Sequence, residues 1–164
     1  MIADVVFVGS AMIALCFGFV VIFGAPYVPT LRRQVTVAFE LLDLQPGQRL
    51  IELGSGDGKV LIAAAKRGIY VTGYELNPLL VIFSWLRTRR YRKFVSIKIA
   101  DFWRADWPEA EAVFGFILPK LMTKLDHKIT AEKRLPLTVV SFAFPIPAKQ
   151  PVKTKNGVFL YEYK

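Results

Sequence analysis

A long apolar run lies at the amino end of the chain. Residues 5–25 include no charged side chain, and Ser10 is their only conventionally polar one. A helix of roughly 20 residues rises about 1.5 Å per residue and spans about 30 Å, the thickness of a bilayer's hydrocarbon core. The pattern predicts one transmembrane helix within an anchor over residues 1–30, ended near the interface by Pro26 and Pro29.

A cleaved signal peptide and a buried core helix are the alternatives to a retained span. No Lys or Arg precedes the run, and the run is longer than the apolar core of a signal peptide. Asp4 is the only side-chain charge before it, whereas Arg32 and Arg33 follow it. The positive-inside rule then predicts a single-pass protein with its amino terminus outside and the rest of the chain on the cytoplasmic or matrix side.

From residue 31 onward, short apolar runs alternate with amphipathic segments. The amphipathic segments predict helices over 34–42, 59–67, 78–90 and 119–133. The short apolar runs predict strands over 49–53, 69–75, 95–100, 112–117 and 137–144, followed by a hairpin of 152–155 and 158–163 around Asn156-Gly157. This alternation predicts one α/β domain over residues 31–164, with a mainly parallel sheet, helices on both faces and a carboxyl-terminal hairpin.

Composition excludes several kinds of site. The chain has 22 Lys and Arg against 13 Asp and Glu, a formal net charge of +9. Cys16 is the only cysteine and His127 the only histidine. These counts exclude a disulfide scaffold and a multi-Cys or His-rich metal centre, so no metal site is predicted.

The segment most informative about chemistry is a glycine-rich turn between a predicted strand and a predicted helix. Residues 51–60 read IELGSGDGKV. The spacing is G-x-G-x-G, which differs from the G-x-G-x-x-G of a dinucleotide site. Glu52 lies within the strand and Asp57 within the turn, where a carboxylate disfavours a pyrophosphate and favours a ligand that carries a cation. The pattern therefore argues against a nicotinamide-dependent oxidoreductase.

Two further acids follow the next two predicted strands. Glu75 ends the second strand, a position from which a carboxylate can bind both ribose hydroxyls. Asp101 follows the third strand and is placed to meet an adenine amino group. With Glu52, these acids lie on three successive strands, so we expect them to face one ligand at the carboxyl edge of the sheet.

The motifs LGSGDGK, YELNP and DFW resemble those of class I (seven-β-strand) S-adenosylmethionine-dependent methyltransferases. Together with the amino-terminal run, PYVPT and VFGF, they resemble more narrowly the membrane-anchored lysine methyltransferases, over nearly the whole chain. That family includes the enzymes acting on the c-subunit of mitochondrial ATP synthase and on the adenine nucleotide translocase, with prokaryotic relatives. The chain is short and lacks the amino-terminal extension of the eukaryotic members, which indicates a prokaryotic relative.

The resemblance implies a Rossmann-like sheet, S-adenosyl-L-methionine as cofactor and S-adenosyl-L-homocysteine as product. It implies a cofactor-binding set in which the residues of the turn surround the methionine end, those after the second strand hold the ribose and those after the third frame the adenine. In that order the set is Glu52, Gly54, Ser55, Gly56, Asp57 and Gly58; Glu75, Leu76 and Asn77; Asp101 and Phe102.

The substrate side is less well defined. Trp103, Phe144 and Pro145 are the candidates, although ordinary packing and chain reversal would explain them as well. No catalytic residue is assigned, because methyl transfer from a sulfonium depends mainly on alignment and a dry pocket.

A dense basic run surrounds the end of the predicted helix over 78–90. It consists of Arg87, Arg89, Arg90, Arg92 and Lys93. Contact with anionic lipid headgroups, contact with nucleic acid and a solvated helix end are all open at this point.

The sequence thus predicts a membrane-anchored methyltransferase that modifies a lysine of a membrane-associated protein. Because the predicted anchor holds the site close to the bilayer, we expect an integral membrane protein as substrate, contact with the lipid bilayer and no nucleic-acid partner. A small or lipid-like acceptor, or a catalytically silent cofactor-binding membrane protein, are the alternatives.

Overall fold

The structure, a computed structural model, describes residues 1–23, 30–132, 135–147 and 149–164. Within residues 1–23 it describes the side chains of 1–11, 14 and 18. Pro26 and Pro29, the predicted end of the first helix, lie outside these residues.

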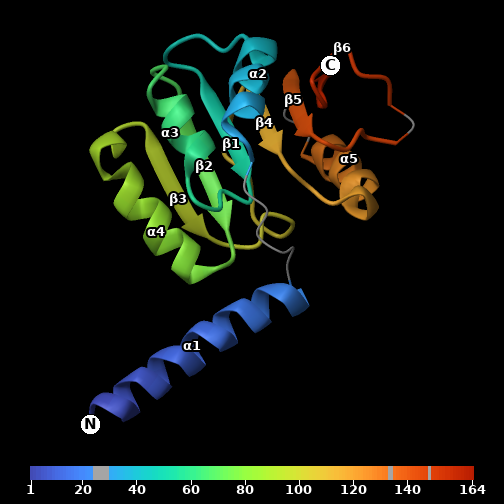
Figure 1. Ribbon diagram of the computed structural model, residues 1–164. Coiled ribbons are helices and arrows are strands. Elements are labelled where there is room, and N and C mark those ends of the chain that lie inside the picture. Colours follow the sequence, from blue (N-terminus) through green and yellow to red (C-terminus); the bar gives the residue numbers. More distant parts are fainter. Residues whose placement is uncertain (24–29, 133–134, 148) are drawn as a thin grey trace.

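The centre of the fold is a seven-stranded sheet (Figure 1) in the order β3-β2-β1-β4-β5-β7-β6. Its strands are β1 (Arg49–Leu53), β2 (Tyr70–Glu75), β3 (Val95–Ile99), β4 (Ala112–Gly115), β5 (Leu137–Phe142), β6 (Lys153–Lys155) and β7 (Val158–Tyr163). The first five strands pair in parallel, whereas β7 pairs antiparallel with both β5 and β6. The predicted mainly parallel sheet with a closing hairpin is confirmed.

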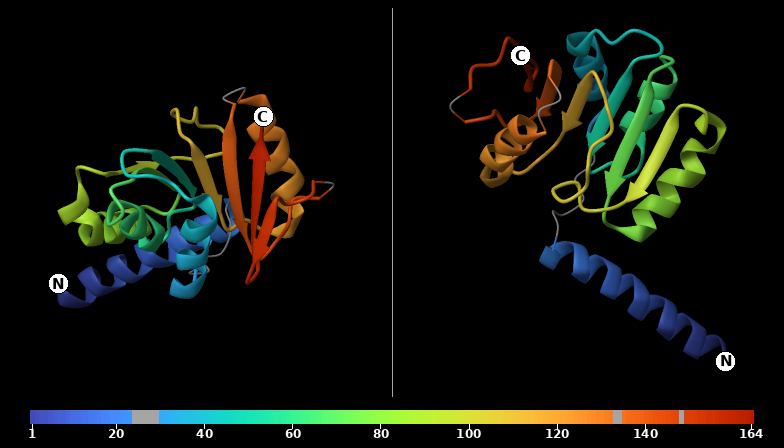
Figure 2. Two further views of the ribbon diagram at one scale, coloured as in Figure 1. Left: turned by 90° about the horizontal axis from the view of Figure 1, so that it is seen from above. Right: turned by 180° about the vertical axis from the view of Figure 1, so that it is seen from behind.

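Helices cover both faces of the sheet, as Figures 1 and 2 show. They are α2 (Arg32–Leu42), α3 (Lys59–Ala65), α4 (Pro78–Thr88) and α5 (Met122–Ala131), with the 3₁₀ turns η1 (Arg89–Tyr91) and η2 (Pro119–Leu121). The helix α1 (Ile2–Phe23) extends away from the sheet (Figure 1). Ala38 of α2 and Leu61 of α3 lie in the core of one face with Phe114 of β4. Ile129 of α5 lies in the core of the opposite face with Tyr161 of β7.

The positions of apolar residues explain these elements. All four residues of β4 are buried, as expected for a central strand covered on both faces. In α2 the buried residues Val35, Ala38, Phe39 and Leu42 recur at intervals of three and four, which directs one stripe of the helix at the sheet.

The strand order reverses beside β1, which lies between β2 and β4. On the two sides of this point the connecting helices lie on opposite faces, and α/β sheets bind ligands at the carboxyl ends of the strands beside such a point. The strands β1–β4 all point their carboxyl ends toward the side from which α1 extends (Figure 1).

The predicted membrane anchor is not supported. Over the part of the chain that the structure describes, no helix offers an apolar stretch long enough to cross a bilayer. A membrane-spanning helix needs about 20 consecutive apolar residues. The prediction of a span depends on taking residues 5–25 as one continuous stretch of this kind. The predicted single-pass topology, with the amino terminus outside and the catalytic domain on the cytoplasmic or matrix side, is therefore wrong.

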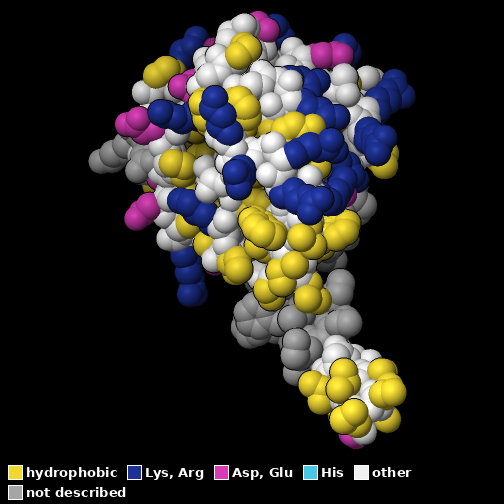
Figure 3. Space-filling model, turned by 90° about the vertical axis from the view of Figure 1, so that its left-hand side faces the viewer, with side chains coloured by type: hydrophobic (Ala, Val, Ile, Leu, Met, Phe, Trp, Pro, Cys, Tyr) yellow, Lys and Arg dark blue, Asp and Glu magenta, His cyan; other side chains and the backbone are white. Residues whose placement is uncertain are grey.

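One exposed surface of the domain is apolar. On α4, the residues Ile82, Phe83, Trp85 and Leu86 are each at least half exposed. Figure 3 views the side of the molecule on which α4 lies, and it shows hydrophobic side chains gathered beside a dense group of Lys and Arg.

Candidate active site

The glycine-rich turn of residues 54–58 leads from β1 into α3 at the carboxyl edge of the sheet. The N–H groups of Gly54 and Ser55 both donate to the carbonyl of Tyr74, at 2.9 and 2.8 Å. These bonds continue the pairing of β1 with β2 beyond the end of β1 and hold the turn against the neighbouring strand. The turn is therefore fixed before any ligand binds.

Glu75, the last residue of β2, fastens the turn from the other side. Its Oε2 accepts a hydrogen bond from the N–H of Gly56 and its Oε1 accepts one from the N–H of Asn77, both at 2.9 Å. Each carboxylate oxygen can accept more than one hydrogen bond. The carboxylate can thus keep both backbone partners and still accept hydroxyl donors from a ligand.

Asn77 and Leu76 complete this corner. Asn77 is buried, and its Oδ1 accepts from the N–H of Leu79 as the amino-terminal cap of α4. Leu76 is half-buried between Glu75 and this cap. The motif YELNP therefore ends a strand, fastens the glycine turn and starts a helix within five residues.

The glycines of the turn have different roles. Gly54 is exposed at a φ of +79°, and a Cβ at this position would meet no neighbouring atom, so a ligand can approach its backbone. Gly58 caps α3 at a φ of +75°, and a Cβ there would run into the side chain of Ser84 in α4. Gly58 thus permits close packing of α3 on α4, and the cofactor contact predicted for it stays a prediction.

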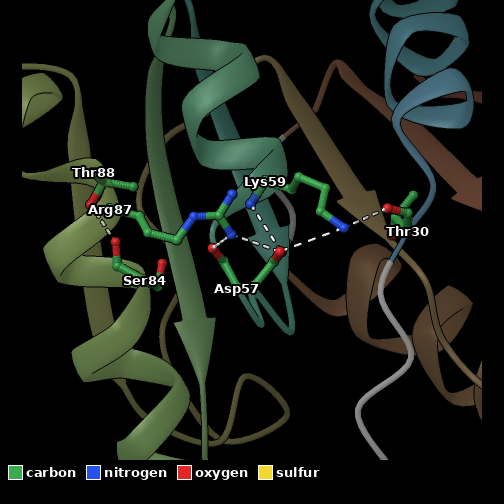
Figure 4. A network of polar contacts seen from close by, with 6 residues as sticks. All are labelled: Thr30, Asp57, Lys59, Ser84, Arg87 and Thr88. Carbon is green, nitrogen blue, oxygen red and sulfur yellow. Dashed lines mark hydrogen bonds and ion pairs between the residues drawn. The ribbon is translucent and has the colours of Figure 1, made fainter.

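Asp57 is the centre of an ionic network that Figure 4 shows. Its carboxylate lies 2.7 Å from Nη1 of Arg87 and 3.5 Å from Nζ of Lys59, and Arg87 also donates to the carbonyl of Asp57 at 2.7 Å. Lys59 donates in turn to the carbonyl of Thr30, in the segment before α2. Because the protein itself supplies two cations to Asp57, a contact of Asp57 with the sulfonium stays a prediction.

Sequence reasoning placed Arg87 in a basic run and missed its role at the turn. Arg87 lies 30 residues from Asp57 along the chain, and four other basic residues follow it closely. The sequence indicates only that the carboxylate in the glycine turn needs a positively charged partner. It does not indicate which arginine of the basic run is that partner.

Glu52 lies beneath the turn, within β1, and is almost fully buried. Loss of hydration on burial raises the pKa of Glu52 well above its usual value, and the negative charges of Asp57 and Glu75 raise it further. A backbone hydrogen bond from Leu61 acts in the opposite direction. The balance favours a protonated Glu52 at pH values where exposed glutamates are ionised.

Several buried polar atoms near the turn lack a hydrogen-bond partner within the described part of the chain. Among them are Oε2 of Glu52, Oγ of Ser55 and Nδ2 of Asn77. Together with the Glu75 carboxylate and the open backbone of Gly54, they offer donors and acceptors to a ligand with hydroxyl and amino groups. The residues present therefore fit the ribose and methionine ends of S-adenosylmethionine.

The third predicted acid has a local role. Oδ1 of Asp101 accepts from the N–H of Trp103 at 2.9 Å, which closes a turn directly after β3. The rings of Phe102 and Trp103 lie 4.6 Å apart, and Nζ of Lys124 lies 4.5 Å from the Trp103 ring centre. Asp101, Phe102 and Trp103 thus form one turn after β3, the strand that pairs with β2.

Phe144 and Pro145 follow β5, on the other side of the point beside β1 at which the strand order reverses. Phe144 is half-buried and stacks on Phe116, with ring centres 6.3 Å apart, whereas Pro145 is exposed. These two residues therefore come from a different part of the carboxyl edge than the turn after β3.

Comparison with known proteins identifies the family. A family model described as the ANTKMT methyltransferase domain matches residues 52–153. The human ATP synthase c-subunit lysine N-methyltransferase is 36% identical over 128 residues, which are 77% of this chain and 54% of the relative. The chain belongs to the ANTKMT methyltransferase family.

Other relatives agree with this assignment. The mouse adenine nucleotide translocase lysine N-methyltransferase is 36% identical over 77% of this chain and 56% of its own length. A protein-lysine N-methyltransferase from Saccharolobus islandicus is 28% identical over 83% of this chain and 92% of its own length. The chain thus spans little more than half the length of these human and mouse relatives.

A solved structure supports both the fold and the cofactor. An RNA methyltransferase from Salinibacter ruber, in complex with S-adenosyl-L-homocysteine, aligns with a TM-score of 0.75 and 29% identity over 83% of this chain and 92% of that chain. The predictions of a Rossmann-like methyltransferase sheet and of S-adenosylmethionine as cofactor are confirmed.

We expect replacement of Glu75 by Gln to weaken S-adenosylmethionine binding at least about tenfold, because hydrogen bonds to a charged group are worth about 1.5–3 kcal/mol each. Isothermal titration calorimetry measures the change. Glu162→Gln, on an exposed position of β7, serves as the control and should bind as the native protein does. Equal affinities for the two variants would exclude Glu75 from the cofactor site.

We expect Glu52→Gln to change how stability depends on pH. Glu52 has a raised pKa in the folded protein, so above its unfolded pKa of about 4.3 the folded state binds a proton that the unfolded state has lost. The stability that depends on this proton falls as the pH rises, and the uncharged glutamine does not share the decline. In urea unfolding, the free energy of unfolding of Glu52→Gln should therefore increase relative to that of the native protein as the pH rises from 4 to 8. A difference that stays constant over this range would contradict the raised pKa of Glu52.

The ion pair of Asp57 with Arg87 should couple the turn to α4. We expect a double-mutant cycle of Asp57→Asn and Arg87→Ala to yield a coupling energy of about 1 kcal/mol in urea unfolding, since the pair is partly exposed. A second cycle with Arg90→Ala, which forms no described ion pair, should yield none. The same coupling in both cycles would mean that long-range charge, not this contact, is responsible.

Proposed function

We propose that this protein transfers a methyl group from S-adenosylmethionine to the side-chain amine of a lysine in a membrane-associated protein. Two kinds of finding support the proposal. The human and mouse relatives given above are named as lysine N-methyltransferases, and the Saccharolobus relative is named as a protein-lysine N-methyltransferase. The site offers a glycine turn that the Glu75 carboxylate and the Tyr74 carbonyl hold by hydrogen bonds.

The single structural observation that carries the cofactor part of the proposal is the bonding of Glu75. The carboxylate is held by the N–H groups of Gly56 and Asn77 at the carboxyl edge of β2. In this position its free lone pairs bind the ribose hydroxyls, Gly54 leaves its backbone open to the methionine end, and Asp101 and Phe102 frame the adenine from the next strand. Bound S-adenosylmethionine supplies a methyl group on a positively charged sulfur, and its transfer to an amine leaves S-adenosyl-L-homocysteine.

The protein contributes position, desolvation and charge. The bonds from Gly54 and Ser55 to Tyr74 fix the turn in advance, so little conformational freedom is lost on binding. Buried Glu52 lies on the floor of the site, where its carboxyl group bonds a ligand amino group. A lysine acceptor must be neutral to react, and loss of hydration on entering the site favours the neutral amine.

The acceptor lysine enters between the turn after β3 and the segment after β5. Trp103, Phe144 and Pro145 are the side chains that this route offers. The contact of Lys124 with the Trp103 ring is an example of a lysine side chain packing on this surface. Aromatic faces attract both ammonium and methylammonium groups, so they suit the substrate and the product.

The names of the relatives support the proposed acceptor class. Their names specify lysines of the ATP synthase c-subunit and of the adenine nucleotide translocase, both membrane-associated proteins. We propose an acceptor of this kind, with the domain over residues 31–164 carrying the cofactor chemistry. The experiment below separates it from RNA, because the Salinibacter neighbour is described as an RNA methyltransferase.

Incubation of the protein with methyl-labelled S-adenosylmethionine tests the proposal. The acceptors are the purified ATP synthase c-subunit in detergent, a membrane fraction, total RNA and a lysine-rich soluble protein. We expect label in protein of the membrane fraction, located on lysine by mass spectrometry. Glu75→Gln should lose the transfer and Glu162→Gln should keep it, whereas label confined to RNA, to lipid or to the soluble protein would refute the assigned acceptor.

A further inference from the structure

The helix α4 has one buried side and one apolar exposed side. Val81, Ser84 and Thr88 are buried against the domain. The opposite side carries Ile82, Phe83, Trp85 and Leu86, with exposed fractions of 56, 51, 62 and 50%. Single exposed apolar residues are common, but four within five positions of one helix form a contiguous patch that calls for a partner.

A basic group follows this patch directly along the chain. It comprises Arg89, Arg90, Arg92 and Lys93, all exposed, of which the first two lie in η1 and the last two in the turn that follows it. None of these four forms an ion pair with a carboxylate of the described residues, and residues 76–100 contain no Asp or Glu at all. Arg87, by contrast, is engaged with Asp57 and is not available. We call the four apolar and the four basic residues together the α4 face.

We infer that the α4 face binds an anionic lipid surface. Aromatic and aliphatic side chains beside exposed Arg and Lys are the composition of helices that lie in the bilayer interface, with the apolar side chains among the acyl chains and the cations at the headgroups. Figure 3 shows the two kinds of side chain adjacent on one side of the molecule. This surface is peripheral and needs no membrane-spanning helix.

The chemistry favours lipid over the other anionic surface, RNA. Ile82 and Leu86 offer neither a stacking face nor a hydrogen bond to a base, so half of the apolar patch has no function on single-stranded RNA. On a bilayer all four apolar residues are buried, and each nearby cation adds attraction to anionic headgroups.

The helix α4 runs between the two edges of the sheet. It begins at Pro78, three residues after Glu75, at the carboxyl edge. Beyond its other end, Arg92 and Lys93 line one pocket with Arg49 and Tyr70, the first residues of β1 and β2, at the amino edge. The inference itself concerns binding and is tested without methyl transfer.

A local fluorescent reporter on the full chain tests the inference. With Cys16 replaced by Ser, Leu86→Cys receives an environment-sensitive dye, and Val152→Cys, similarly exposed but near β6, receives the same dye as control. Vesicles of equal parts phosphatidylcholine and phosphatidylglycerol should shift the emission of the dye at 86 to the blue and leave that at 152 unchanged. Pure phosphatidylcholine should give a much smaller shift.

A charge comparison sharpens the test. Replacing Arg89, Arg90, Arg92 and Lys93 together by Gln should weaken partitioning onto the anionic vesicles at least about tenfold. Replacing Lys66, Lys120, Lys153 and Lys164 by Gln removes the same net charge from exposed positions elsewhere and should have a small effect. The inference would be overturned if the two variants lost equal affinity, or if neutral vesicles gave an equal shift in emission. It would also be overturned if the dye at position 86 showed no shift, or if single-stranded RNA in place of vesicles produced one.

Discussion

The carboxylate of Glu75 is the contact on which the candidate site depends. It ends β2, accepts the N–H of Gly56 in the turn after β1 and accepts the N–H of Asn77 at the start of α4. One side chain thus sets the distance between the loops of two neighbouring strands and the start of a helix. Its negative charge is stabilised by backbone donors, which leaves its remaining lone pairs to a ligand.

The turn is held from its outer side by a second set of charges. Asp57 joins Arg87 of α4 and Lys59 of α3, and Lys59 reaches the carbonyl of Thr30. Since Arg87 belongs to α4, the helix with the apolar outer face is also the helix that steadies the cofactor turn. The four cations at the end of α4 form no ion pair among the described residues. A site that binds a cationic cofactor and a surface that binds anions can therefore coexist in one small domain.

The sequence by itself determined the order of strands and helices, because apolar periodicity and turn residues are local signals. The predicted strand over 49–53 agrees with β1, and Pro78 and Asn156-Gly157 correctly marked a helix start and a hairpin. The glycine turn, Glu75 and the family were also recognisable, because their residues are close together in the chain.

The tertiary structure decided which charges meet. The pairing of Asp57 with Arg87 and the packing of Gly58 on Ser84 join residues whose contact depends on how α3 and α4 pack. The hydropathy of residues 5–25 predicted a membrane span, whereas no helix among the described residues is long and apolar enough to cross a membrane. The exposed side of α4 likewise became visible only in the fold. Val81 and Ile82 are both apolar in the sequence, and only the packing of the helix buries Val81 and exposes Ile82.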